Sequence, residues 1–305
     1  MIQLDEAGVR ERLQMPELID AMESALAAFS RGDVDQPVRS VVEVAPGRGF
    51  LGVMPAHVRD SDSLGCKLVT VFHGNHDRGL PGHQAVILLF DSDTGSLVAI
   101  MDGRYITEVR TAAVSAVSAK LLANPGARSV GILGSGVQAR SHVEALSHVL
   151  KDATFRAWSP NRAHLEAFAA ESGAVAADSA RSAVADADLI VVATASAEPV
   201  LDAAWVKPGA HVMAVGACRP YQRELDPKLA MSRLFVDSRA AAVKESGDIV
   251  MSGFESLIVG ELGELIAGGI EGRTAADQIT VFKSLGLAVE DVATARLVYD
   301  RAIKL

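Results

Sequence analysis

A glycine-rich turn at residues 130–139 constrains the fold more than any other part of the sequence. The mostly apolar run 130–133 leads into Gly134, Gly136 and Ala139, which match the pattern G-x-G-x-x-A. In a dinucleotide-binding domain the first glycine permits the tight turn, the second lets backbone N–H groups approach the pyrophosphate, and the third small residue lets the helix pack on the strand. Apolar residues continue at helical spacing at Val143, Leu146 and Leu150. This context predicts a phosphate-binding helix N-terminus, whereas a glycine turn alone often just joins a strand to a helix.

Short apolar runs and helical stretches alternate after this turn, as in a parallel sheet with helices on both faces. The candidate strands are residues 129–133, 154–158, 189–193, 211–215 and 234–236, and one helical stretch is 162–170. Before residue 103, β-rich runs follow one another directly, which predicts an antiparallel sheet. These runs are residues 38–44, 50–54, 65–72, 84–90 and 97–101, with a hairpin turn at 91–95.

Helices are also predicted at residues 16–31, 111–123 and 285–305, the last of which we expect to return to the first domain. A chain of 305 residues is long enough for two domains. We therefore expect an α/β protein made of a Rossmann-type doubly wound parallel sheet and a smaller α+β domain. The smaller domain is placed at residues 1–115 with the helix 285–305, and the Rossmann domain at 116–284.

Charge and composition narrow the class of protein. A net charge of −9 without a basic run argues against nucleic acid as a partner. The two cysteines, Cys66 and Cys218, are far apart in sequence, which is typical of a chain made for a reducing cytosol. The N-terminus does not resemble a signal peptide, and no apolar run is long enough to span a bilayer. We expect a soluble, cytoplasmic protein that does not bind membranes.

The end of the second Rossmann strand bears on the choice of cofactor. NAD-binding domains usually carry an acidic residue about 20 positions after the glycine turn, where it binds the ribose 2′-hydroxyl. This chain has Ser159, Asn161 and Arg162 in that region instead. Their donors and positive charge suit a 2′-phosphate, so NADP(H) is expected in preference to NAD(H). The alternative is an ordinary solvated turn at the start of a helix.

Three cations, Arg39, Lys67 and Arg110, lie in or beside otherwise apolar runs that we interpret as strands. Burying such cations is costly without an anionic partner. Together they could hold a substrate carboxylate, with bidentate contacts from arginine and a point charge from lysine. The alternative is that each faces solvent or pairs with a local acid.

Histidines and serines give little support to other chemistries. His73, His76 and His83 lie in or near a glycine-rich stretch without a neighbouring cysteine or an H-E-x-x-H helix, so no metal site is expected. His83 opens an apolar run and is better interpreted as a polar residue that faces the substrate. No G-x-S-x-G motif is present, so a serine hydrolase has no support.

Motifs along nearly the whole chain resemble the ornithine cyclodeaminase/mu-crystallin family, most closely its ketimine reductase branch. Besides the glycine turn, the matching stretches are Gln36–Arg39, Leu51–Ala56, Lys67–Thr70, Met101–Gly103, Arg110–Ala113, Trp205–His211, Gly216–Pro220, Arg223–Asp226, Lys244–Asp248 and Val281–Gly286. The resemblance implies an NAD(P)-dependent homodimer whose first domain forms the subunit interface and holds a small imino acid or amino acid.

The resemblance also implies roles for individual residues. Arg39, Lys67 and Arg110 match the family's carboxylate-binding positions, with Lys67 and Arg110 as the catalytic pair. The expected cofactor contacts are Thr111, Gly134, Gly136, Val137, Gln138, Ser159, Asn161, Arg162, Thr194, Cys218 and Leu285. Among these, Thr194 and the loop that contains Cys218 are expected near the nicotinamide.

Two departures from the family pattern separate its branches. Where the cyclodeaminases have acidic residues, this chain has Gly52 and Cys218. A cyclodeaminase without both acids lacks its general bases, whereas a ketimine reductase mainly has to bind and orient its reactants. The expected activity is NAD(P)H-dependent reduction of 1-pyrroline-2-carboxylate or 1-piperideine-2-carboxylate.

Other functions remain open at this stage. An alanine-type amino-acid dehydrogenase would use the same residues. The further alternatives are an ornithine cyclodeaminase and a non-catalytic, crystallin-like protein that binds NADPH. Cys218 lacks an activating base and is interpreted either as a small residue that lines the site or as a structural residue.

Overall fold

The computed structural model describes residues 1–45 and 47–304, which form two compact units. The first unit contains residues 1–110 and 287–305, and the second contains residues 111–286. The boundary falls after Arg110, inside one continuous helix, α3 (Gly103–Leu122), whereas we expected it after residue 115 in the same helix. None of the helices in the described residues is long and apolar enough to cross a membrane.

The first unit is built on a mixed sheet with the strand order β1-β7-β6-β5-β4-β2, in which β3 also pairs with β4. Its centre is an antiparallel meander of β4 to β7, as the consecutive β-rich runs predict. The strands are β1 (Ile2–Leu4), β2 (Val34–Asp35), β3 (Ser40–Ala45), β4 (Gly49–Val58), β5 (Ser63–Val71), β6 (His83–Phe90) and β7 (Leu97–Asp102).

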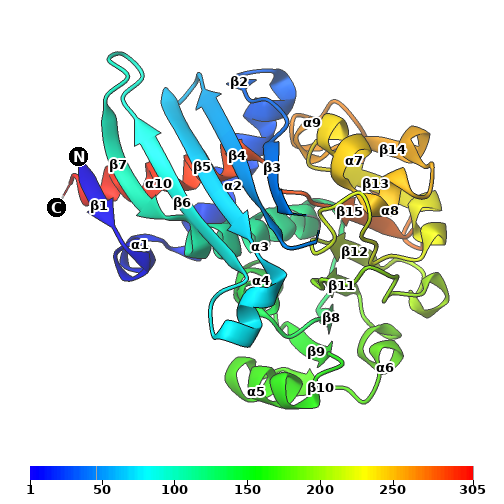
Figure 1. Cartoon of the computed structure of the whole chain (residues 1–305). Helices are drawn as coiled ribbons and strands as arrows, with labels where there is room; N and C mark the ends of the chain where they lie inside the picture. The colour runs from blue at the N-terminus through cyan, green and yellow to red at the C-terminus, as the bar shows by residue number, and fades with distance from the viewer. Residues whose placement is uncertain (46, 305) are drawn as a thin grey trace. The chain divides into compact units, whose positions relative to one another are not determined.

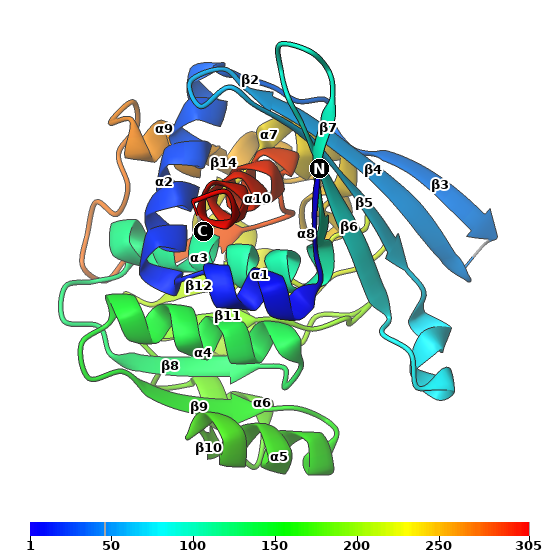
Figure 2. The same cartoon turned by 90° about the vertical axis from the view of Figure 1, so that its left-hand side faces the viewer.

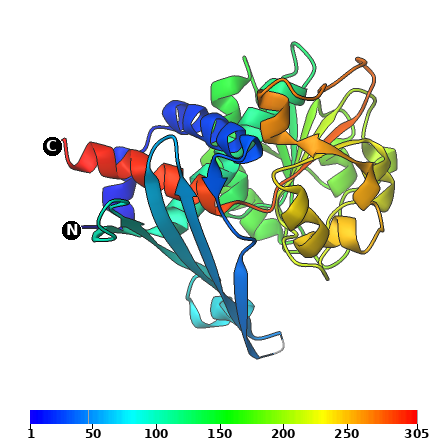
Figure 3. The same ribbon diagram turned by 90° about the horizontal axis from the view of Figure 1, so that it is seen from above.

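Two long helices cover one side of this sheet (Figure 3). The helix α10 (Ala288–Ala302) lies between the sheet and α2 (Met15–Arg31), as Figure 2 shows in a view along α10. Side chains of β5 alternate between buried and half-buried positions, and the buried set includes Ser63, Lys67 and Val69. Because side chains alternate between the two faces of a strand, Lys67 lies on the buried face of the sheet.

Shorter helices complete the first unit. The helix α1 (Glu6–Arg12) starts at Asp5, whose side chain accepts a hydrogen bond from the Gly8 N–H. The helix α2 ends at Gly32, which has a positive φ of 81° that glycine adopts without strain. A 3₁₀ helix η1 (His73–Arg78) follows β5. It includes His73 and His76, the histidines considered as metal ligands, and their side chains lie outside the described part of the structure.

The second unit contains a parallel sheet with the order β10-β9-β8-β11-β12-β15-β13-β14. The chain runs outward from β8 to β10 and then reverses to β11, which places the topological switch point of the sheet between β8 and β11. The strands are β8 (Ser129–Leu133), β9 (Thr154–Trp158), β10 (Val175–Ala176), β11 (Leu189–Val192), β12 (His211–Ala214), β13 (Arg233–Val236), β14 (Ile258–Glu261) and β15 (Thr280–Lys283). The predicted Rossmann-type α/β class is confirmed.

Helices cover both faces of this sheet (Figure 1). Leu189 and Val191 belong to the apolar cluster on the side of α4 and α5, whereas Ile190 and Val192 belong to the cluster on the opposite side. A strand buried on both faces is apolar throughout, as in this run of four residues. The helices of the unit besides α3 are α4 (Val137–Val149), α5 (Arg162–Ser172), α6 (Ala180–Val184), α7 (Arg239–Glu245), α8 (Gly247–Val250) and α9 (Leu262–Ile266), with 3₁₀ turns η2 (Ala203–Trp205), η3 (Pro227–Met231) and η4 (Glu255–Leu257).

Several sequence predictions were wrong in detail. The run 106–114 is helical, because α3 starts at Gly103 rather than at residue 111. Residues 108–119 are all buried, so the helix has no polar face and no helical period to detect. Arg110 is therefore carried by a helix, and Arg39 lies just before β3 rather than within a strand. The strand β15 was missed as well, since its two apolar residues, Val281 and Phe282, form too short a run to give a clear signal.

Candidate active site

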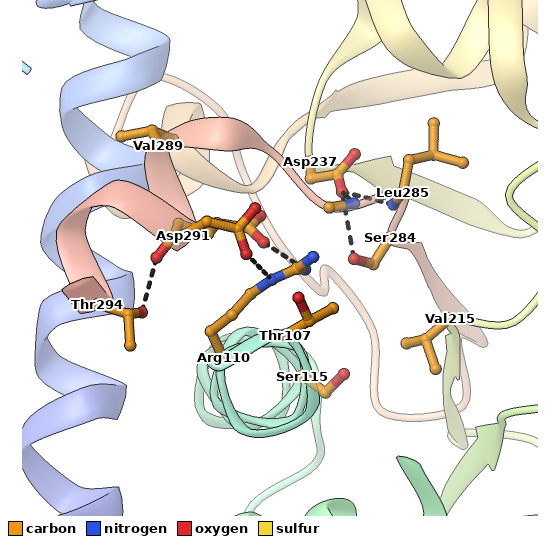
Figure 4. Close-up of polar contacts among 12 residues, drawn as sticks. Thr107, Arg110, Ser115, Val215, Asp237, Ser284, Leu285, Val289, Asp291 and Thr294 are labelled. Carbon is orange, nitrogen blue, oxygen red and sulfur yellow. Dashed lines mark hydrogen bonds and ion pairs between the residues drawn. The ribbon is translucent and has the colours of Figure 1, made fainter. Parts of the chain in front are cut away.

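A buried cluster of charged side chains lies in the first unit between α3, β5 and α10. Lys67 Nζ lies 2.5 Å from Asp291 Oδ2, and Arg110 Nε donates to Asp291 Oδ1 at 3.0 Å. Arg110 Nη1 also donates to Glu290 Oε2 at 2.7 Å. Figure 4 shows Arg110 extending from α3 toward Asp291. We call Lys67, Arg110, Glu290 and Asp291 the charge cluster.

The charge cluster is almost completely shielded from water. The side chains of Glu290 and Asp291 are fully buried, and Lys67 and Arg110 are only 2% and 5% exposed. The pKa of Lys67 is lowered to about 8, chiefly by burial and also by the positive charges of Arg110 and Arg39. The negative charge of Asp291 opposes this shift only in part. Burial alone would raise the pKa of Asp291, but Arg110 and Lys67 reverse this effect and hold the pKa below its ordinary value.

Two further predicted residues act on the same cluster electrostatically. His83, the first residue of β6, has its pKa lowered to about 4 by burial and by the nearby charges of Lys67 and Arg110. Its imidazole is therefore neutral near pH 7 and can both donate and accept a hydrogen bond. Arg39 is half-buried, and its charge is one of those that lower the pKa of Lys67. The four residues assigned to the substrate thus share one electrostatic environment.

The acids of the charge cluster were missed by the sequence analysis. We considered only local acids as partners, whereas Glu290 and Asp291 come from α10, about 180 positions after Arg110. Acidic residues in the first turn of a helix are ordinary because they complement the helix dipole. The available signal was that this acidic pair interrupts a stripe of apolar residues on α10, where Ala288, Val292, Ala295 and Val298 are all buried.

In the second unit, the glycine turn has the geometry of a phosphate-binding loop. Gly134 has a φ of +123°, and a Cβ atom there would lie 2.4 Å from the Ala193 carbonyl oxygen. Gly136 caps the N-terminus of α4 without a side-chain hydrogen bond, and a Cβ atom there would meet nothing within 4 Å. The first glycine is thus required by the fold, whereas the second leaves open space over a helix N-terminus, where phosphate binds well.

Two neighbours of this turn also fit a bound dinucleotide. Val137, the first residue of α4, is 47% exposed although its side chain is apolar. The Oε1 atom of Gln138 is buried and has no hydrogen-bond partner within residues 1–45 and 47–304. An exposed apolar group and an unsatisfied buried acceptor beside a phosphate-binding turn are features that a ligand would cover and satisfy.

The end of β9 presents the residues that we assigned to the 2′-phosphate. Asn161 caps α5, since its side chain accepts a hydrogen bond from the His164 N–H at 3.1 Å. Arg162 is 56% exposed and pairs with Glu166 at 2.7 Å and with Asp178 at 3.6 Å. Such exposed pairs contribute only about 0–1 kcal/mol, so they leave the guanidinium available to a phosphate. Ser159 is half-buried just after β9.

The remaining predicted cofactor residues lie in four places in this unit. Thr111 is buried in α3. Thr194 follows β11, and both its N–H and its hydroxyl donate to Glu224 Oε2. Leu285 follows β15, and its N–H donates to Asp237 Oδ2 at 2.6 Å, as Figure 4 shows. Cys218 is half-buried with its Sγ 3.5 Å from the Val215 carbonyl oxygen, a contact that also fits a structural role.

Comparison with known proteins places this chain in a family. The model of the ornithine cyclodeaminase/mu-crystallin family matches residues 1–304. The chain belongs to this family. The suspected resemblance is therefore confirmed over essentially the full length of the sequence.

Individual members of the family are similar over nearly their whole length. The ketimine reductase mu-crystallin of Mus musculus is 50% identical over 289 residues, which cover 93% of this chain and 91% of the mouse protein. A structure of Thermococcus litoralis Delta(1)-pyrroline-2-carboxylate reductase in complex with NADH and L-proline has a TM-score of 0.95 at 36% identity, with 100% and 98% of the two chains covered. An archaeal alanine dehydrogenase dimer with bound NAD has a TM-score of 0.93 at 32% identity, with 100% and 96% covered.

Proposed function

We propose that this chain is an NAD(P)H-dependent reductase that transfers hydride to the C=N carbon of a small cyclic imino acid, 1-pyrroline-2-carboxylate or 1-piperideine-2-carboxylate. The observation that carries the proposal is the buried pair Lys67 and Arg110, which share Asp291 and lie in the field of Arg39. Relatives that share the fold and a third to a half of the residues are named as reductases of such imines.

The charge cluster supplies a site for the substrate carboxylate. Lys67 and Arg110 are both buried against Asp291, and the charge of the half-buried Arg39 also acts on Lys67. Arginine can bind a carboxylate through two hydrogen bonds and lysine through a point charge, so these three side chains would hold the carboxylate of the substrate. Asp291 also fixes the orientation of both Lys67 and Arg110 before the substrate arrives, which reduces the entropy lost on binding.

Lys67 is also suited to act on the imine nitrogen. With a pKa of about 8 it is mostly protonated near pH 7, and it can share that proton with a neighbouring nitrogen at little cost. A protonated imine attracts hydride to its carbon. When bound, the reduced nicotinamide supplies that hydride, and the residues of this chain orient the two reactants.

The cofactor is held by the second unit in this proposal. The backbone around Gly134 and Gly136 and the N-terminus of α4 would bind the pyrophosphate, with Val137 and Gln138 against the dinucleotide. We propose that NADP(H) is preferred over NAD(H), because Ser159, Asn161 and Arg162 offer donors and a positive charge to a 2′-phosphate. Relatives whose structures contain NADH or NAD show that the family also uses the cofactor without this phosphate.

The two positions at which this chain differs from the cyclodeaminases argue against a cyclodeaminase reaction. Gly52 lies in β4, and a Cβ atom there would already be 3.0 Å from a methyl group of Val69. The other position is the half-buried Cys218. Neither supplies a carboxylate that could act as the general base of a cyclodeaminase.

Steady-state rates test this proposal. NADPH and NADH would each be tested with both imine ring sizes, with pyruvate and ammonia, and with ornithine plus the oxidised cofactor. Turnover of a cyclic imine supports the proposal. A requirement for ammonia and a 2-oxo acid would instead indicate an alanine-type dehydrogenase, ornithine-dependent ammonia release a cyclodeaminase, and NADPH binding without any turnover a crystallin-like binding protein.

The proposed enzyme is a cytoplasmic homodimer. The archaeal alanine dehydrogenase with the same fold is a dimer. Light scattering coupled to gel filtration would give the mass of the assembly, to be compared with 32.0 kDa for one chain.

A further inference from the structure

A fully buried carboxylate connects two loops of the Rossmann sheet. Glu224 Oε1 accepts hydrogen bonds from the N–H groups of Gly216 at 2.7 Å and Ala217 at 3.2 Å, just after β12. Its other oxygen, Oε2, accepts from the N–H of Thr194 at 3.2 Å and from the Thr194 hydroxyl at 3.1 Å, just after β11. One side chain thus receives four donors from the carboxyl ends of two adjacent parallel strands.

Two further buried charges hold Glu224 in place. Asp248 Oδ1 accepts hydrogen bonds from the backbone N–H groups of Glu224 at 2.9 Å and Leu225 at 3.0 Å. Lys283 Nζ, at the end of β15, lies 3.2 Å from Asp248 Oδ2 and 3.4 Å from Glu224 Oε1. Burial alone would lower the pKa of Lys283, but the carboxylates of Asp248 and Glu224 outweigh it and raise that pKa, so the lysine stays charged. We call Glu224, Asp248 and Lys283 the buried triad.

The loops are in close contact where the buried triad connects them. A Cβ atom on Gly216 would lie 2.0 Å from the Thr194 carbonyl oxygen and 2.5 Å from Glu224 Oε2. Only glycine fits at that position, so the relative placement of the two loops is narrowly defined. In open α/β sheets, ligands bind outside the carboxyl ends of the strands, next to the switch point, which here lies between β8 and β11.

We propose that Glu224 is a positioning residue for the nicotinamide half of the cofactor, because it fixes the loops after β11 and β12 through Thr194, Gly216 and Ala217. This inference rests on the proposed function and on the family resemblance, which implies that Thr194 and the loop that contains Cys218 lie near the nicotinamide. The adenine half is bound elsewhere, by the glycine turn and the end of β9. Loss of Glu224 therefore affects one half of the dinucleotide and leaves the other unchanged.

The choice of a carboxylate supports this role. An amide in place of Glu224 keeps only one acceptor oxygen, while four donors from two loops require both oxygens of an ionised carboxylate. A buried charge pair contributes little net stability compared with apolar packing, yet it fixes geometry well when every donor is satisfied.

The experiment compares two ligands that differ only in the nicotinamide end. Calorimetric titration with NADPH and with 2′-phospho-ADP-ribose, which lacks that ring, would be carried out on the wild type and on Glu224→Gln. We expect the affinity for NADPH to fall about tenfold or more, while the affinity for 2′-phospho-ADP-ribose changes less than twofold. Equal losses for both ligands, or no loss for either, would overturn the inference.

A matched control and a milder variant guard against simple loss of folding. Asp188 accepts from the N–H groups of Arg128 at 2.9 Å and Ser129 at 3.0 Å and pairs with Lys207 at 2.7 Å, at the opposite end of the same sheet. Asp188→Asn should change both affinities equally. If Glu224→Gln does not fold, Asp248→Asn removes a charge that holds Glu224 in place without changing any predicted cofactor contact, and it should weaken NADPH binding alone, about threefold. Equal effects on the two ligands would again contradict the role.

The outcome also separates this inference from the proposed function. The titrations use no imine, so a protein that binds both ligands but reduces no imine contradicts only the proposed function. A protein that reduces imines but shows no selective loss in Glu224→Gln contradicts only the inference. A wild type that binds neither ligand overturns both.

Discussion

Replacing Asp291 by asparagine tests the electrostatic account of the charge cluster. The carboxylate is fully buried and neutralises Lys67 at 2.5 Å and Arg110 at 3.0 Å, two cations that are themselves 2% and 5% exposed. In Asp291→Asn, Lys67 loses this ion pair, and Arg110 retains Glu290. Removing one partner of a buried ion pair typically costs about 3–5 kcal/mol, because the other charge is left uncompensated. We expect a loss of this size in the first unit.

Hydrogen exchange followed by mass spectrometry can measure this loss in the correct unit. Both tryptophans, Trp158 and Trp205, belong to the second unit, so their fluorescence does not report on the charge cluster. Peptides from α10 and β5 should lose protection by a factor of about 100 to 1,000, which corresponds to roughly 3–4 kcal/mol. Peptides from the second unit should be much less affected.

A matched control lies on the same helix. Asp300 pairs with Arg296 at 2.8 Å, and its side chain is 38% exposed. Asp300→Asn should cost less than about 1 kcal/mol, as exposed pairs do. The double variant Lys67→Met/Asp291→Asn should be less destabilised than the sum of its parts, since no isolated charge remains. If Asp291→Asn costs as little as Asp300→Asn, the cluster is not held by compensated charge and the reasoning is wrong.

Three more predictions follow from the geometry. Arg162→Ala should lower the preference for NADPH over NADH about tenfold or more, while Arg156→Ala on the preceding strand β9 should not; equal ratios would exclude Arg162 from the 2′-phosphate. The affinity for pyrrole-2-carboxylate, an aromatic analogue of the five-membered imino acid, should fall as pH rises through about 8, because Lys67 loses its proton there. A constant affinity from about pH 6.5 to about pH 9.5 would contradict this prediction. Gly134→Ala should lower the free energy of unfolding, measured by the fluorescence of Trp158 and Trp205, by about 2 kcal/mol or more. Gly136→Ala should leave this free energy unchanged and weaken NADPH binding instead. The opposite pattern would refute the roles of the two glycines.

Much of the fold could be predicted because its signals are local. The strands at 129–133 and 154–158 have the predicted bounds, since each is followed by a helix that begins with a clear turn or cap. The helix α3 was assigned too late in the chain, because burial on every side removes the helical period. The strand β15, which inserts between β12 and β13, gives no local signal of its place in the sheet order.

Part of the site could also be predicted, because some of its signals are local in the sequence. Lys67 and Arg110 stood out as charges in apolar runs, which signals burial. Their partners could not be predicted, because sequence shows that a buried charge needs compensation but not which distant helix provides it. Glu224 lay in a recognised motif, yet its function depends on donors from Thr194 and Gly216 that only the folded sheet brings together.

Product formation from a cyclic imine tests the central claim most directly. The purified protein would be mixed with NADPH and either 1-pyrroline-2-carboxylate or 1-piperideine-2-carboxylate, with NADPH followed by its absorbance and the amino acid identified by mass spectrometry. The account predicts that one molecule of proline or pipecolate forms for each NADPH oxidised. A protein that binds NADPH and yet forms neither product from either ring would contradict it.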